Sequence, residues 1–436
     1  MWSGFQLCRC KQPLKAAQNK LLACGTRYGL NSSNLLTRQL YTPLRNGHSN
    51  KLQSRISELL KSNKIFVRLN SSTQKPASSK MVGYWLLGCS GMVFTAVVLG
   101  GVTRLTESGL SMVTWKLLGE KLPRTEEQWQ EEFEKYKQYP EFKYKNHSMS
   151  LSEFKWIWWM EYAHRTWGRA IGLCVLGPAA ALALAGRLPA AMRPRVAVYC
   201  ALVAAQGLMG WYMVKSGLED RFEGPADVPR VSQYRLAAHL SLALLLYAGL
   251  LAGALRLLRP PPAPAALAAP TPALPRGLRS IFALAHAVKA MVFFTAVSGA
   301  FVAGLDAGLV YNSFPKMGDR WVPEEVLALR PAARNLTENP ATTQLQHRAL
   351  GVATLAAATA AAAHAVTRRA PLPPAARRLA VAVGALAWLQ VSLGVGTLLC
   401  YVPTWLAAAH QANSLALLGA AVCLTHEVKL LRYIPK

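Results

Sequence analysis

The sequence has little charge, and acidic charge is the scarcest. Only 16% of its 436 residues are charged, and 49 Lys and Arg outnumber 21 Asp and Glu. A hydrophobic content of 52% excludes an ordinary soluble globular chain. The net charge of +28 would by itself favour a nucleic-acid partner. Its distribution argues against nucleic acid, because much of the excess lies in one terminal segment.

That segment is residues 1–80, which hold fourteen Lys and Arg and a single acid, Glu58. It is also rich in Ser, Asn and Gln, and no apolar run follows its first charges, which excludes a secretory signal. A basic, acid-poor, Ser-containing leader is typical of a mitochondrial transit peptide. A disordered basic tail is the alternative. We assign 1–80 to a transit peptide and leader, with the mature protein beginning between Lys61 and Lys80.

Cysteine is present without any spacing typical of a metal or disulfide framework. Three of the eight cysteines lie in the leader, and the others are isolated in apolar stretches, where Cys behaves as a small hydrophobe. The sequence therefore predicts no thiol chemistry.

Apolar stretches close to the 20 or so residues that cross a bilayer recur along the chain. There are eight of them, at roughly 82–102, 156–183, 196–215, 234–257, 281–304, 344–366, 379–400 and 405–427. The predicted fold class is an all-α integral membrane protein with eight transmembrane helices. A Pro- and Ala-rich linker over 259–279 separates an N-terminal half, 81–258, from a C-terminal half, 280–428, and a basic tail occupies 429–436.

The two halves repeat one order of features. Each has a helix with a Gly-rich end, a helix opening with His-Arg, a helix with Gln-x-x-x-Gly, and a helix with a lone His. Because each half has an even number of helices, both insert in the same orientation. We therefore expect two tandem parallel four-helix bundles.

Loop charges predict the topology. The connections after the second, fourth and sixth helices carry several Arg and no acid, whereas those after the first, third and fifth mix both signs. The positive-inside rule then places both termini and the Arg-rich loops on the matrix side. The longest mixed-sign connection, about 116–154, is expected to be a charged loop facing the intermembrane space.

Four of the nine histidines occupy matching places, each predicted five to nine residues into an even-numbered helix: His164, His239, His347 and His410. The other five, His48, His147, His286, His364 and His426, lack a counterpart in the other half. Two imidazoles from two helices at one depth suit haem iron, which takes an axial ligand on each face. Zinc would need further ligands. Unpaired structural histidines and a transporter with a His-based proton relay remain alternatives.

A porphyrin also needs space and counter-charges. The residue four places after each of these histidines, on the same helix face, is small: Gly168, Ala243, Gly351 and Ser414. Three arginines near the predicted membrane surface, Arg165, Arg169 and Arg348, are candidates to pair with haem propionates.

Glu161 distinguishes the halves, since it lies three residues before His164, where the C-terminal half has Gln344 before His347. A single carboxylate against one ring in apolar surroundings suits proton transfer. Capping the helix or pairing with Arg165 is the equally weighted alternative. The difference predicts chemistry in the first half and a fixed haem in the second. A di-haem b-type membrane cytochrome that only relays electrons is the alternative function.

Several motifs together resemble the haem A synthase family of cytochrome c oxidase assembly, mitochondrial type, from about residue 80 to the end. They are Gly-Gly-Val-Thr-Arg-Leu-Thr-Glu-Ser-Gly-Leu-Ser-Met at 100–112, Glu-Tyr-x-His-Arg at 161–165, Ala-Gly-Leu-Asp-Ala-Gly-x-x-Tyr-Asn-Ser-Phe-Pro at 303–315, Gln344 with Gln-His-Arg at 346–348, and Ala-His-Gln at 409–411. The resemblance implies a multi-pass enzyme of the mitochondrial inner membrane. It would oxidise the C8 methyl of haem O to a formyl group by successive hydroxylation, giving haem A.

The resemblance also implies a set of roles and partners. Haem b falls on His347 and His410, the substrate haem O falls on His164 and His239, and the catalytic glutamate of the family falls on Glu161. Implied partners are a matrix ferredoxin and its reductase as electron source, haem O synthase, oxidase assembly factors and membrane lipid, and a homo-oligomer is compatible. Many bacterial relatives have a cysteine pair in the first outer loop, but residues 103–155 contain no Cys.

Overall fold

The computed structural model describes residues 76–219, 229–261, 276–367 and 372–433. Within these ranges the chain is helical and has no β-strand, apart from one isolated bridge between Met317 and Arg320. The prediction of an all-α fold is therefore confirmed. Most of the predicted leader, positions 262–275 of the predicted linker and the last three residues of the predicted tail lie outside the described residues.

Among the described residues, eight helices are long and apolar enough to cross a membrane, which confirms the eight predicted spans. All eight begin before the predicted start and six end beyond the predicted end, because helices continue past the apolar core into the interface. The helices are α3 (Pro76–Leu105), α6 (Leu151–Leu184), α7 (Arg193–Leu218), α8 (Gln233–Leu258), α9 (Arg276–Gly304), α11 (Pro340–Thr367), α12 (Pro374–Leu399) and α13 (Thr404–Leu430).

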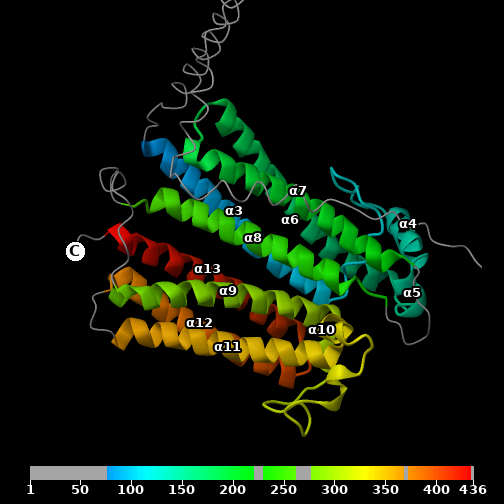
Figure 1. The fold of residues 1–436 in the computed structure, drawn as a ribbon. Helices are drawn as coiled ribbons and strands as arrows, with labels where there is room; N and C mark the ends of the chain where they lie inside the picture. The colour runs from blue at the N-terminus through cyan, green and yellow to red at the C-terminus, as the bar shows by residue number, and fades with distance from the viewer. Residues whose placement is uncertain (1–75, 220–228, 262–275, 368–371, 434–436) are drawn as a thin grey trace, which may run out of the picture. The chain divides into compact units, whose positions relative to one another are not determined.

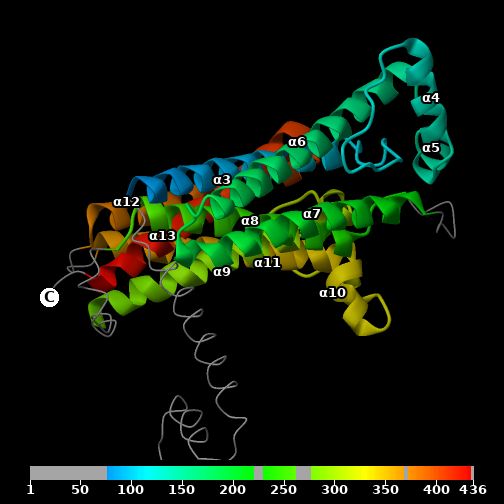
Figure 2. The same ribbon diagram turned by 90° about the horizontal axis from the view of Figure 1, so that it is seen from above.

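The long helices pack in two groups along the chain (Figures 1 and 2). In the first, α3 packs on α6 and α8, and α7 packs on α6 and α8. In the second, α9 packs on α11 and α13, and α12 packs on α11 and α13. Contacts of α8 with α9 and α13, and of α3 with α13, join the groups. The buried side chains of both groups form one continuous apolar cluster.

Several polar contacts cross between the groups, including two that involve α3. The Arg104 guanidinium of α3 forms a 2.6 Å ion pair with Asp306, which follows α9. The Gln411 side chain of α13 donates a 3.0 Å hydrogen bond to the Val97 carbonyl of α3. A Cβ at Gly101 would overlap the Gln411 carboxamide, so the absence of a side chain there lets α13 approach α3. This contact places the residue after His410 against the N-terminal group.

The Gly-rich ends of α3 and α9 share a backbone feature. Glu107, just beyond α3, and Asp306, just beyond α9, are acidic residues in the left-handed region, with φ of 54° and 51°. Non-glycine residues seldom adopt this conformation. Each carboxylate is held by a cation, Lys145 in the first case and Arg104 in the second, at 2.6 Å. Both helices thus end in a turn of the same kind.

The connection expected to be a charged loop contains two helices, α4 (Glu126–Lys137) and α5 (Pro140–Tyr144). Thr125 caps α4 by accepting a hydrogen bond from the Gln128 amide, and acids occupy its first turn. Its aromatic face packs with the start of α6 in a small separate core formed by Met112, Trp129, Phe133, Tyr136, Phe154, Ile157 and Trp158. We call α4, α5 and this core the outer cap.

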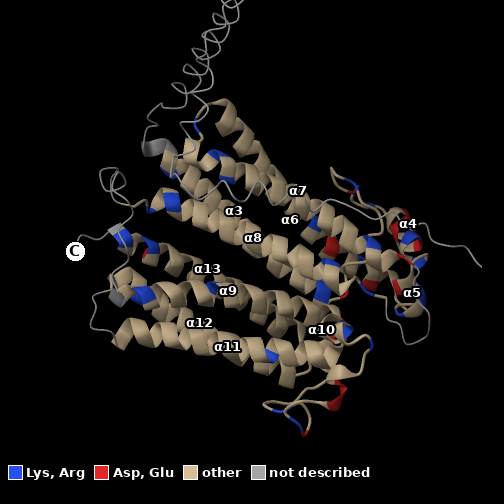
Figure 3. Cartoon of the chain, viewed as in Figure 1, with Lys and Arg blue, Asp and Glu red and all other residues tan. Residues whose placement is uncertain are grey.

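The outer cap also changes the position of His164 in its helix. A capping box between Ser150 and Glu153 starts α6 at Leu151, thirteen residues before His164 rather than the five to nine expected. Hydropathy missed the added turns because they pack on the outer cap. Charged residues gather toward the ends of the long helices (Figure 3). Acids concentrate at the end bearing α4 and α5, and the opposite end carries mainly Lys and Arg.

Candidate functional site

The four predicted histidines each lie against a glycine of a neighbouring helix. His164 of α6 faces α3, His239 of α8 faces α7, His347 of α11 faces α9, and His410 of α13 faces α12. In the same order, the glycines are Gly100, Gly210, Gly299 and Gly394. A Cβ added to each would lie 2.9 Å, 3.1 Å, 3.1 Å and 2.8 Å from the nearest atom of the imidazole ring. Two of these distances are shorter than real Cβ contacts, and the other two are tighter than nearly all of them. Glycine therefore makes the space that each imidazole occupies.

His347 and His410 form a pair with a geometry suited to one metal centre. Their ring centroids are 6.5 Å apart and the ring planes cross at 76°. Two imidazoles bound on opposite faces of one iron would place their centroids roughly 6 Å apart, given metal–nitrogen bonds of about 2.0 Å. The C-terminal pair therefore has the separation that axial ligation of a haem iron requires.

Hydrogen bonds fix both imidazoles of this pair. The Ser298 hydroxyl donates to the Thr295 carbonyl at 2.7 Å, so it accepts the proton of His347 Nδ1, also at 2.7 Å. The His410 Nδ1 donates to the Gln390 carbonyl at 3.1 Å. With Nδ1 protonated on each ring, Nε2 carries the lone pair that binds iron. This second set of contacts is typical of metal-binding histidines.

One amide lies close to the free nitrogen of His410. The Gln390 Nε2 is 3.2 Å from His410 Nε2, and Asn413 orients that carboxamide by donating to its Oε1 at 2.8 Å. Coordination of a metal by His410 Nε2 would break the contact with Gln390, whereas the backbone hydrogen bond to Nδ1 would remain.

The N-terminal pair lacks this anchoring. The Nδ1 of His239 is buried and has no hydrogen-bond partner among the described residues. The Gln206 amide, which corresponds to Gln390, donates to the His239 backbone carbonyl at 3.1 Å rather than to the ring. The position matching Ser298 is Leu99, which offers no hydrogen bond to His164. The two histidine pairs thus share a backbone setting and differ in what holds the rings.

Glu161 is buried, with 3% of its surface exposed, and it pairs with Arg165. The Arg165 Nε lies 2.5 Å from Glu161 Oε1. The same guanidinium donates to the carbonyls of Met112 at 2.8 Å and Thr114 at 2.7 Å. The ion pair weighed from the sequence is therefore present. Within the described part of the chain, no hydrogen bond joins Glu161 to His164.

The corresponding residue in the C-terminal half is an amide that also contacts the arginine four residues later. Gln344 donates to the Ala307 carbonyl at 2.8 Å, and Arg348 donates to Gln344 at 3.1 Å and to the Tyr311 carbonyl at 3.0 Å. In both halves the arginine after the histidine ties down the segment that follows the first helix. The halves differ in that a carboxylate in one is a neutral amide in the other.

Two of the predicted propionate partners have unused donors. The Arg169 Nη2 donates to the Lys116 carbonyl at 2.8 Å, but its Nη1 is buried without a partner in the described residues. The Arg348 Nε is orphaned in the same way. Buried polar groups are nearly always paired, so these two donors fit an anionic ligand. A Cβ at Gly168 or Gly351 would meet nothing within 4 Å, which leaves open space beside the histidines.

Sequence reasoning identified the four histidines, Glu161 and the arginines but did not assign the groups that position them. Gly210 and Gly394 belong to the repeated Gln-x-x-x-Gly motif. Because each half has one such motif and one lone histidine in the next helix, the motif could have indicated that the glycine and the histidine are in contact. Gly100 lay in a motif without a role, and Ser298 had no sequence indication at all.

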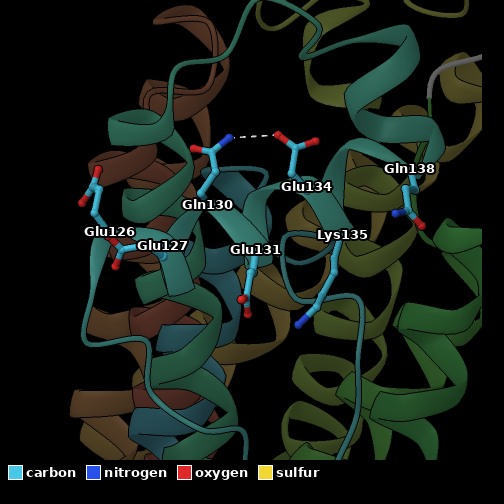
Figure 4. Close-up of a pocket in the computed structure, with 7 residues that line it drawn as sticks. All are labelled: Glu126, Glu127, Gln130, Glu131, Glu134, Lys135 and Gln138. Carbon is cyan, nitrogen blue, oxygen red and sulfur yellow. Dashed lines mark hydrogen bonds between the residues drawn. The ribbon is translucent and has the colours of Figure 1, made fainter.

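An open depression on α4 lies apart from these residues (Figure 4). It is lined by Glu126, Glu127, Gln130, Glu131, Glu134, Lys135 and Gln138, all exposed. It contains no histidine, and Figure 4 shows a hydrogen bond between Gln130 and Glu134 within it. It is part of the solvated face of the outer cap.

Fold and site together define a class: a multi-pass α-helical membrane protein with one histidine pair at the spacing that haem ligation requires, and a second pair in matching helices. The family model for the cytochrome oxidase assembly protein COX15-CtaA matches residues 83–422. The chain belongs to this family.

Individual relatives agree over most of their length. The chain is 52% identical to heme A synthase COX15 of Homo sapiens over 398 residues, covering 90% of this chain and 91% of that protein. It is 41% identical to heme A synthase COX15 of Saccharomyces cerevisiae over 373 residues, covering 81% and 76%. A bacterial relative, heme A synthase of Nitrosospira multiformis, is 42% identical over 357 residues, covering 82% and 96%.

Proposed function

We propose that this protein is a haem A synthase, a membrane oxidoreductase that converts haem O to haem A. Membership of the family and identities of 40–52% with relatives named heme A synthase support this activity. The conversion turns the C8 methyl of haem O into a formyl group. Two successive hydroxylations give an alcohol and then a geminal diol, which loses water. The net change replaces two hydrogens of the methyl with one oxygen.

The C-terminal half holds a resident haem b through His347 and His410. The 6.5 Å separation of their rings and the hydrogen bonds at both Nδ1 atoms support this assignment. A haem b bound there supplies a one-electron redox centre. Ser298 and the Gln390 carbonyl hold the rings in place and make the imidazoles stronger donors, which suits a group that stays bound. Arg348 contributes its unpaired Nε–H to a propionate.

The N-terminal half takes the substrate through His164 and His239. The observation that carries this assignment is the missing anchor at the His239 Nδ1, set against the two anchored rings of the other pair. A substrate haem has to enter and its product has to leave. Imidazoles without a partner at Nδ1 are weaker and more mobile ligands, which favours exchange.

Glu161 acts as the acid–base or polarising group at the methyl being oxidised. It is the buried carboxylate of the substrate half, and Arg165 fixes its orientation through the 2.5 Å contact. A positioned carboxylate can accept the proton released when a C–H bond becomes a C–O bond. Arg165 and Arg169 bind propionates, and Gly168 and Gly351 leave room for the porphyrin edge.

The site of action is the mitochondrial inner membrane, with both termini on the matrix side. The basic leader, the Arg-rich loops and the mitochondrial character of the resemblance support this placement. A matrix ferredoxin and its reductase supply electrons, and haem O synthase and oxidase assembly factors are the neighbours in haem transfer. A homo-oligomer is compatible with this arrangement.

The test is to purify the full chain and to extract its haems. The proposed enzyme carries haem b together with haem O, haem A or hydroxylated intermediates, separable by chromatography and mass. A cytochrome that only relays electrons would yield haem b alone, and a transporter would show no Soret absorption. Either result would overturn the proposed function.

A further inference from the structure

A cavity of about 290 Å³ opens beside the N-terminal histidine pair. Three segments surround it: the loop 112–115 after α3, α6 at Arg165, and the last turns of α7. Arg165 directly follows His164, and Trp211 of α7 directly follows Gly210, which abuts the His239 ring. The cavity therefore borders α6, which carries His164, and α7, whose Gly210 abuts the His239 ring.

Two cations line this cavity, and one of them has no role so far. Arg165 uses N–H groups on Glu161, Met112 and Thr114, and a guanidinium has five N–H donors. Lys215 lies 5.7 Å from the centre of the Trp211 ring and has no acidic partner among the described residues. A hollow lined by two cations and the apolar Trp211, Val214 and Leu218 suits a carboxylate carried on a flat apolar body.

The other half has an equivalent for only one of the cations of the N-terminal site. Aligning the Gln-x-x-x-Gly motifs pairs Lys215 with Leu399 and Trp211 with Val395. Aligning the His-Arg motifs pairs Arg169 with Val352. The N-terminal half thus has three cations where the C-terminal half has only Arg348. The added positive charge belongs to the half from which a ligand must be exchanged.

We propose that this cavity is the carboxylate subsite of the exchangeable porphyrin, with Lys215 as its principal charge and Arg165 as its second. The proposal rests on the proposed function, because it takes the N-terminal half as the substrate site. Arg165 is already bound to Glu161 and two carbonyls, so Lys215 is the cation free to pair with an incoming carboxylate. Trp211 supports the lysine and covers the porphyrin edge. A lipid phosphate is the other anion with this chemistry.

The experiment uses the full chain carrying its resident haem, in nanodiscs of neutral phosphatidylcholine. Haem O and its dipropionate dimethyl ester are titrated in, and binding is followed by Soret difference spectra. The wild type should bind the diacid more tightly than the ester. Lys215→Met should weaken diacid binding about tenfold, as expected for one charge-assisted hydrogen bond, and leave ester binding unchanged. Lys215→Arg should restore the preference.

Lys155→Met is the matched control, since Lys155 lies at the outer end of α6 but pairs with Glu126; it should leave both affinities unchanged. Equal binding of diacid and ester by the wild type would overturn the proposal, a result that needs no variant to fold. An equal loss for both ligands in Lys215→Met would do the same. The proposal would also fail if Lys215→Met bound cardiolipin in nanodiscs less tightly than the wild type does but kept the full preference for the diacid. That result would assign the site to a lipid phosphate.

Different variants test the substrate site and its carboxylate subsite. If His164→Ala and His239→Ala bind haem O as the wild type does, the assignment of the substrate site is wrong. If those variants lose binding while Lys215→Met still prefers the diacid as strongly as the wild type, only the carboxylate subsite is wrong.

Discussion

The two halves of the molecule place their histidines in the same backbone setting but differ in the hydrogen bonds to the imidazole rings. In both, glycine on a neighbouring helix makes room for each imidazole. In the C-terminal half, Ser298 and the Gln390 carbonyl hold both Nδ1 atoms. In the N-terminal half, Nδ1 of His239 has no partner in the described residues. This difference supports the proposal that one half keeps its haem and the other exchanges it, because the groups behind the imidazoles are what differ.

The two halves also differ in the side chain that contacts the arginine after the first histidine of each pair. Glu161 and Gln344 occupy equivalent helical positions and both contact the arginine that secures the neighbouring loop. Since the loop is held in either case, structural support does not require a charge. Structural support alone therefore does not explain why the N-terminal half has a carboxylate at this position, and the chemical role proposed for Glu161 does.

The largest expected effect comes from removing the anchored ligands. His347→Ala and His410→Ala should each abolish the resident low-spin haem, because one axial ligand is lost from a pair spaced for six-coordinate iron. His164→Ala and His239→Ala should retain that haem and lose bound haem O. Pyridine haemochrome spectra of the purified variants measure both. A His410→Ala protein with the normal low-spin spectrum would refute the assignment of the halves.

Glu161→Gln should give the next largest effect. Replacing the carboxylate with its isosteric amide should lower the rate of haem A formation by about 100-fold or more, the usual contribution of a positioned acid or base. The resident haem spectrum should stay unchanged, which shows that the variant is folded. Gln344→Glu, the reciprocal change in the other half, serves as the control and should leave the rate near normal. A normal rate in Glu161→Gln would show that the carboxylate only secures Arg165.

Sequence alone predicts the parts of this molecule that repeat. Helix length and hydropathy locate the eight spans, because a bilayer demands about 20 apolar residues in each. The duplication singles out His164, His239, His347 and His410, since an isolated histidine in one helix carries no such comparison. The contrast of Glu161 with Gln344 follows from the same alignment.

The sequence does not show which side chains of different helices meet, because this depends on how each helix is rotated about its axis. Ser298 reaches His347 across two helices, and no local pattern marks that serine among others in apolar stretches. Gln411 meets Gly101 across the two halves, a contact separated by more than 300 residues. The α4 helix escaped detection because its stability depends on packing with α6 rather than on membrane-like hydropathy.

Ser298→Ala should sharpen the comparison between the halves at moderate magnitude. Without an acceptor at Nδ1, His347 becomes a weaker donor, so haem b should dissociate about 10 to 100 times more readily and its midpoint potential should rise. Dissociation into apomyoglobin and a redox titration measure these changes. Ser280→Ala on the same helix is the control, because Ser280 contacts His364, which is not a proposed ligand. If both variants behave like the wild type, anchoring does not distinguish the halves.

The smallest expected effect concerns the outer cap and the segment around Asn335 that corresponds to it in the C-terminal half. In the N-terminal half, Glu141 is buried and accepts a 2.9 Å hydrogen bond from Tyr136. Burial raises the pKa of Glu141 to about 7, against the opposing effect of that hydrogen bond. The corresponding region of the C-terminal half is held by the amides of Asn335 and Asn339, which do not titrate.

The folded pKa of Glu141 lies above its unfolded value near 4.5. The protonated carboxyl therefore stabilises the folded cap fully below pH 4.5, and this contribution is lost as pH rises through about 7. The free energy of opening α4 and α5 should fall by about 1 to 3 kcal/mol between pH 5 and 8. Hydrogen exchange over Glu126–Tyr144, corrected for the intrinsic pH dependence of exchange, measures it. Glu141→Gln should remove the dependence, and segments around Asn335 should show none in either protein. A wild-type cap that opens equally at both pH values would mean that the two halves differ at their histidines and not at their caps.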